Sequence, residues 1–138
     1  MDLSEKIAAF DLPGSACEFG EQRGRWQRWR QRVRDQARAS FASLNLPLAD
    51  PVRLVCHFRV LRRAKAHDLD NILKQLIDGL GAAGLFRKAR TGGRTSEWNT
   101  EDDWVYVIEA TKELVDSEAS TYVEIYVSKE VARVVRTI

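Results

Sequence analysis

The sequence predicts an α+β protein, with a small mixed sheet of about four strands packed against two or three helices. Two segments, 22–44 and 69–80, carry apolar residues at every third or fourth position, which is the spacing of helices with one buried face. Three other segments are alternating or rich in β-branched and aromatic residues, as strands are: 52–61, 104–110 and 122–127.

The first part of the chain predicts one strand and one helix. Residues 7–10 are expected to form a short strand. The sequence Leu12-Pro13-Gly14-Ser15 is expected to break it. In the helix at 22–44 the apolar stripe includes Trp26 and Trp29, which we expect in the core rather than stacked on nucleic-acid bases.

The second helix is expected to begin at an acidic motif. Its apolar residues start at Leu69, so Asp68 or Asp70 can serve as the N-cap, and Asp78 is expected to face solvent. Residues 87–100 are basic and poor in apolar side chains, which predicts a mobile loop. Ser128 is expected to cap a last helix near the end of the sequence.

Charge is segregated along a chain whose formal net charge is only +2. Residues 21–65 hold twelve Arg or Lys against three acidic residues, a net +9, whereas residues 97–130 hold ten acidic residues against two Lys, a net −8. This pattern favours a basic surface beside an acidic pocket, as in a nuclease that binds both a polyanion and a metal ion. The alternative is that solvated faces simply differ in sign.

Size and cysteine usage place the protein in a broad class. At 138 residues it is expected to be one domain over 1–138. Cys17 and Cys56 lie in unlike settings and suggest no disulfide framework, so a reducing cytoplasm fits best. No signal peptide and no apolar run of about 20 residues is present, so we expect neither export nor a membrane partner.

Two acidic groups carry the candidate chemistry. Asp68 and Asp70 precede or open the second helix, and Asp102 and Asp103 precede a strand. Carboxylates gathered in one place need a positive partner, and hard oxygen ligands select Mg²⁺ or Mn²⁺. Lys74 lies one helical turn beyond Asp70, where its ammonium can contact a phosphate or protonate a leaving oxygen. By spacing alone, helix capping and surface charge explain these residues more often than a pair of metal ligands does.

The segment Asp68-Leu-Asp-Asn-Ile-Leu-Lys74-Gln-Leu-Ile-Asp78-Gly-Leu, followed by Asp102-Asp103 and an apolar strand, resembles the RusA family of Holliday junction resolvases. The resemblance implies a RusA-like fold and a homodimer that cuts two strands of a four-way junction in symmetry. It also implies that Asp68, Asp70 and Asp103 bind Mg²⁺ or Mn²⁺, with Asp102 as a neighbouring candidate, and that these aspartates and Lys74 are catalytic.

Two features depart from the RusA pattern. Arg87 to Thr100 intervene between the helix and the second acidic group, where the family has only a few residues. The Pro- and Asn-containing stretch that follows the family's first strand is reduced here to Leu12-Pro13-Gly14-Ser15. The inserted residues are expected either to add a DNA contact or to displace Asp103 from the site. The second difference leaves the dimer contacts and the N-terminal alignment open.

The sequence therefore predicts a metal-dependent endodeoxyribonuclease that resolves branched double-stranded DNA in recombination and repair. We expect phosphate contacts from basic residues of the first helix and the loops: Arg25, Arg28, Arg32, Arg62, Arg63, Lys65, Arg87, Lys88, Arg90 and Arg94. Two alternatives remain open, a catalytically inactive DNA-binding protein and a hydrolase of free nucleotides.

Overall fold

A computed structural model describes residues 5–16, 24–48, 50–62, 68–88, 98 and 100–127, apart from the side chain of Asp103. Within these residues seven elements follow one another: β1 (Glu5–Pro13), α1 (Arg25–Ser40), β2 (Val52–Leu61), α2 (Leu69–Ala82), the short 3₁₀ helix η1 (Asp102–Trp104), β3 (Val105–Val115) and β4 (Ser120–Val127).

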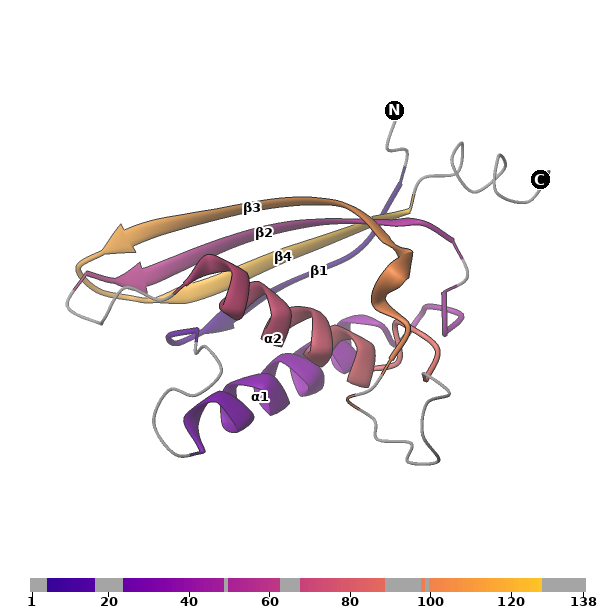
Figure 1. Cartoon of the computed structure of the whole chain (residues 1–138), viewed down its shortest axis with the longest axis horizontal. Coiled ribbons are helices and arrows are strands. Elements are labelled where there is room, and N and C mark those ends of the chain that lie inside the picture. Colours follow the sequence, from indigo (N-terminus) through magenta and orange to yellow (C-terminus); the bar gives the residue numbers. More distant parts are fainter. Residues whose placement is uncertain are drawn as a thin grey trace.

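The four strands form one mixed sheet in the order β1-β4-β2-β3. β4 pairs antiparallel with both β1 and β2, whereas β2 and β3 run parallel and are joined through α2. Figure 1 shows both helices on the same side of the sheet. The predicted α+β class and the mixed sheet of about four strands are confirmed.

The core lies between the helices and the sheet. Alternate residues of β2 are buried along its whole length, as the period-2 pattern predicted. Trp29 and Val33 of α1 and Leu76 of α2 are at most 2% exposed against this face. Cys56 of β2 is a free thiol inside the core, and burial raises its pKa to about 12 because the thiolate would lose its hydration.

The boundaries of β1 and α1 differ from those predicted. β1 continues through Leu12 to Pro13, because Leu12 belongs to the core and Pro13 takes the last position of an edge strand, where a missing N–H is tolerated. Gly14 follows Pro13 with φ of +99°, a backbone conformation that does not continue a strand. α1 ends at Ser40, so the apolar spacing at Leu44 lies beyond the helix and Leu44 packs on the core from a loop.

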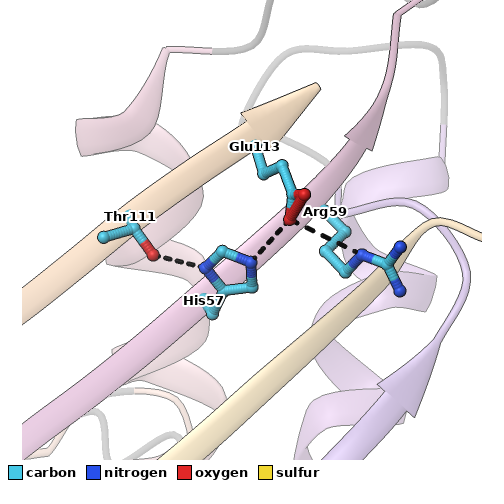
Figure 2. A network of polar contacts seen from close by, with 4 residues as sticks. All are labelled: His57, Arg59, Thr111 and Glu113. Atoms are coloured by element: carbon cyan, nitrogen blue, oxygen red, sulfur yellow. Dashed lines mark hydrogen bonds and ion pairs between the residues drawn. The ribbon is translucent and has the colours of Figure 1, made fainter. Parts of the chain in front are cut away.

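β3 is longer than predicted, because it continues past Ala110 to Val115. Two of the added residues, Thr111 and Glu113, are polar and lie beside His57 and Arg59 of β2 on the sheet face opposite the helices. Figure 2 shows His57 between Thr111 and Glu113, with Glu113 3.0 Å from His57 Nε2 and 3.7 Å from Arg59 Nε. These cross-strand pairs explain the extension, which apolar spacing alone does not indicate.

Three sequence predictions fall wholly or partly outside the described residues. The last helix after Ser128 lies outside them, and so do most residues of the basic loop at 87–100. Of that loop, Lys88 and Thr100 form an isolated antiparallel bridge. The third is the expected absence of a membrane-spanning segment, which was made for the whole sequence. Among the described helices, none is long and apolar enough to cross a membrane.

The two helices approach each other closely at Gly79 of α2. A Cβ atom at this position would lie 2.7 Å from Val33 Cγ1 and 3.2 Å from the carbonyl oxygen of Arg30, both on α1. Because neither neighbour is the far end of a flexible side chain, the missing side chain of Gly79 sets the distance between the helices.

We predict that Gly79→Ala destabilises the protein by about 1–3 kcal/mol, since the clash with Val33 outweighs the higher helix propensity of alanine. Urea unfolding measures this change. Gln36→Ala, on the exposed face of α1, is the matched control and should change the free energy of unfolding by no more than about 0.5 kcal/mol. A Gly79→Ala protein as stable as the wild type would show that the helices do not need this contact.

Candidate functional site

The first turn of α2 holds the two aspartates of the D-L-D-N motif. Asp68 is the N-cap, with φ of −69° and ψ of 122°, and its side chain accepts a hydrogen bond of 3.2 Å from the backbone N–H of Asp70. Asp70 lies in the first turn, where the positive end of the helix dipole favours a carboxylate. Both side chains are exposed, so capping explains Asp68 without any metal.

One face of α2 continues from Asp70 into a pocket. Lys74 and Asp78 follow Asp70 at steps of four residues and therefore lie on the same side of the helix. The pocket has a volume of about 210 Å³ and opens between the two helices. Its walls are Trp26 and Arg30 of α1 with Asn71, Lys74, Gln75 and Asp78 of α2.

Arg30 is held in place by aromatic rings and by a carboxylate. Its guanidinium carbon lies 4.9 Å from the ring centre of Trp26 and 3.9 Å from that of Trp98. Its Nη1 atom is 3.9 Å from Asp78 Oδ2. Cation–π contact and this ion pair fix the guanidinium at the pocket wall with a side chain only 16% exposed.

Asp78 is not a solvent-facing residue, which corrects the expectation from the sequence. Its side chain is 24% exposed and faces Arg30 across the helix interface. Burial raises the pKa of Asp78, because the charged form loses hydration; Arg30 and Lys74 oppose this shift, and the charge of Asp102 adds to it. The carboxyl group therefore belongs to the pocket.

Gln75 is the most buried polar residue of the pocket. It is 2% exposed, and its Oε1 atom has no hydrogen-bond partner within the described residues. Buried polar atoms are nearly always paired, because an unmade hydrogen bond inside a protein is unfavourable by about 1–3 kcal/mol. Because the Oε1 atom is itself buried, it is an unmade hydrogen bond of the protein interior beside the pocket and not an acceptor exposed in the pocket.

The second acidic group approaches α2 from its other end. Thr100 packs on Gly81 so closely that a Cβ atom added at residue 81 would clash with Thr100 Oγ1. Gly81 is eleven residues beyond Asp70, about 16 Å along the helix axis. Asp102 follows Thr100 in η1 and lies close enough to Asp78 to influence its titration.

The predicted metal ligands are not gathered by the described part of the chain. No group of three His, Cys, Asp or Glu side chains suitable for a metal ion occurs among the described residues. Asp68 and Asp70 open α2, while Asp102 acts on Asp78 two turns further on. The side chain of Asp103 lies outside the described residues, so the four-aspartate metal site remains a prediction.

The predicted phosphate contacts divide into three groups. Arg25, Arg28 and Arg32 recur on one side of α1, and Arg28 and Arg32 are exposed, the latter donating to the carbonyl oxygen of Pro13. Arg62 is paired with Asp116 at 3.2 Å, and Arg87 and Lys88 are exposed. Four others lie outside the described residues: Arg63, Lys65, Arg90 and Arg94.

Four pocket residues were given no functional role of their own by the sequence analysis: Arg30, Asn71, Gln75 and Asp78. Two of them carry a spacing signal, since Arg30 follows Trp26 by four residues and Asp78 follows Lys74 by four. Trp29 is in the core as expected, whereas Trp26 is only partly buried and forms a pocket wall. The expectation that Trp26 serves only the core was therefore incomplete.

Comparison with known proteins adds no family to this picture. No protein-family model matches the chain, and no curated protein is significantly similar to it.

We predict that Asp68→Ala destabilises the protein by about 0.5–2 kcal/mol, because the N–H of Asp70 loses its capping acceptor. Asp68→Asn keeps an acceptor oxygen at the same place and should lose only about 0.3–1 kcal/mol through the missing charge at the helix start. Thermal unfolding of both variants measures the difference. Equal stabilities of the alanine variant and the wild type would exclude the capping role.

Asp78 should make stability depend on pH. Its folded pKa is raised above the unfolded value, so its contribution to stability is complete below the unfolded pKa and is lost as pH rises through the folded pKa. We expect the stability of the wild type relative to Asp78→Asn to fall as the pH rises from acid toward neutral in urea unfolding series. Asp35→Asn, which removes an exposed carboxylate of α1, is the control. If the wild type instead becomes more stable relative to Asp78→Asn as the pH rises, the pKa of Asp78 is not raised by folding.

Proposed function

We propose that the protein is a metal-dependent endodeoxyribonuclease of branched DNA, acting as a homodimer on Holliday junctions or related structures. The observation that carries the proposal is one continuous face of α2, on which Asp70, Lys74 and Asp78 follow each other beside the arginine-rich helix α1. The D-L-D-N motif that opens this face is the part of the sequence that resembles the RusA family.

The chemistry of this face suits a phosphodiester. The Lys74 ammonium is exposed at the pocket, where it can bind a phosphate oxygen or supply a proton to a leaving oxygen. Arg28 and Arg32 leave α1 toward solvent and can neutralise backbone phosphates of a duplex. Mg²⁺ or Mn²⁺ is the proposed cofactor. Its proposed ligands are Asp68, Asp70 and Asp103, with Asp102 as the neighbouring candidate, and the assignment depends on Asp103.

A second candidate function is DNA binding without cleavage. Two observations favour it: the described carboxylates do not form a metal-binding group, and Asp68 already serves as the N-cap of α2. Such a protein would bind junction or duplex DNA through phosphate contacts, with an affinity that falls steeply with salt and needs no divalent ion.

Cleavage of a synthetic four-way junction in Mg²⁺ or Mn²⁺ tests the proposal. We expect wild-type protein to cut paired strands, and Asp70→Asn and Lys74→Met to lower the single-turnover rate on the order of 100-fold or more, as loss of a metal ligand or of a proton donor does. Asp35→Asn, on an exposed part of α1, is the matched control and should cut at the wild-type rate.

The outcomes separate the two functions. Equal cleavage by the wild type and Asp70→Asn would show that this acidic face is not the active site. Salt-sensitive junction binding by all four proteins, with no cleavage in either metal, would favour the binding protein.

A further inference from the structure

The outer side of β3 has no partner strand among the described residues. β3 is the last strand in the order β1-β4-β2-β3 and pairs only with β2, and Figure 1 shows it at the margin of the sheet. Over its eleven residues it leaves a row of backbone N–H and C=O groups open to another strand. We infer that two copies of the chain join through this edge, by antiparallel pairing of β3 with β3 of the second copy. The inference rests on the homodimer of the proposed function and assigns the interface of that dimer.

Apolar side chains are left uncovered along this edge. Tyr106, Ile108 and Leu114 are 52%, 42% and 45% exposed. Ile108 lies beside Leu54 of β2, and Leu114 lies beside Val60; both β2 residues are buried in the core between the sheet and the helices. Because neighbours in a sheet point to the same face, Ile108 and Leu114 also point to the helix side. A long edge strand with exposed apolar side chains is a place where another strand adds.

The acidic residues of β3 already have cationic partners within the same chain. Glu109 accepts a hydrogen bond from Arg53 of β2, and Glu113 lies beside His57 and Arg59, as Figure 2 shows for the second group. These pairs lie on the sheet face opposite the helices. A second copy can therefore approach the edge without meeting carboxylates that lack a counterion.

The order of side chains in β3 selects one register for the pair. In a two-fold antiparallel pair the helices of both copies lie on the same side of the sheet, so one residue of β3 must lie opposite its own copy. With Ala110 on the axis all eleven residues are paired, no like charges lie opposite each other, and Tyr106 faces Leu114. With the axis at residue 109, Glu109 faces itself, and with the axis at residue 111 it faces Glu113. Like charges directly opposite are unfavourable, so the register centred on Ala110 is favoured.

This register joins two four-stranded sheets into one sheet of eight strands. Ile108 of each copy then lies opposite Lys112 of the other, whose aliphatic stem can cover it. The exposed apolar side chains of the two edges become neighbours on the helix side of the joined sheet and lose contact with water. A second copy of the chain is therefore the partner that the side chains of β3 fit.

Disulfide trapping in the absence of DNA tests the interface and its register. The variant is Ala110→Cys in a Cys17→Ser background, since the remaining Cys56 is buried. Residues directly opposite in an antiparallel pair have Cα atoms about 4.5–5.5 Å apart, which is within the range that a disulfide bridges. We expect mild oxidation to convert most of this variant to a covalent dimer, measured on a non-reducing gel.

Two further cysteine variants are matched controls. Ala9→Cys makes the same substitution at an exposed position of β1, the other edge strand of the sheet. Lys112→Cys lies on β3 itself, but in the favoured register its two copies are four residues apart along the strands, roughly 14 Å, which is too far for a disulfide. Neither control should form a covalent dimer under the same conditions.

A pair of charge variants at residue 108 tests the contact with Lys112 of the second copy. Ile108→Lys and Ile108→Glu remove the same exposed apolar side chain, but the first places like charges opposite each other at two symmetric positions and the second places opposite charges there. We expect the dimer of Ile108→Lys to have a dissociation constant roughly tenfold or more above that of Ile108→Glu. Sedimentation velocity measures both constants, and equal far-UV circular dichroism spectra show that both variants are folded.

The outcomes are distinct from those of the cleavage experiment. A wild-type dimer that is trapped at residue 110 alone and is weakened more by Ile108→Lys than by Ile108→Glu supports the inference, whether or not junctions are cut. A wild type that stays monomeric overturns it, and so do trapping through residue 9, no trapping at residue 110, or equal dissociation constants of the two charge variants. In each of these cases junction cleavage that depends on Asp70 would leave the proposed nuclease activity standing.

Discussion

The close contact of α1 and α2 at Gly79 is the constraint on which the candidate site depends. An ordinary side chain at residue 79 would push the backbone of Arg30 away from α2, because the Arg30 carbonyl oxygen lies only 3.2 Å from the place that an added Cβ would take. Because residue 79 has no side chain, the helices pack closely enough for Arg30 Nη1 to lie 3.9 Å from Asp78 Oδ2. Both helices use the sheet as their common support, and burial of Val33 and Leu76 against it holds the contact closed.

This contact places charged groups where water is scarce. Arg30 and Asp78 have side chains 16% and 24% exposed, so each is partly desolvated and each needs the other. Trp26 and Trp98 cover the guanidinium, whose charge they attract through their π faces. The result is a pocket with a cationic wall held by aromatic rings, beside which the buried Gln75 acceptor has no hydrogen-bond partner among the described residues.

A sequence pattern predicts the end of an element well when neighbouring residues determine that end, and poorly when a residue far along the chain determines it. The strand at 52–61 was predicted with its observed ends, because β2 alternates between core and solvent over its full length. The ends of β1 and β3 were missed, since Leu12 is held by the core and Thr111 by a cross-strand partner that is 54 residues away. The N-cap at Asp68 was among the expected roles and is present. Whether Asp103 joins Asp70 at a metal ion stays a prediction.

The sequence by itself determined the class of fold, the existence of both helices and the order of acidic and basic groups along the chain, because hydrophobic periodicity and capping act over a few residues. Only the tertiary structure decided which of these groups meet. It paired Arg30 with Asp78, placed Trp98 over Arg30 and buried Gln75 beside the pocket between the two helices. These contacts join residues from separate elements, and their distances depend on how closely two helices pack, which no local spacing encodes.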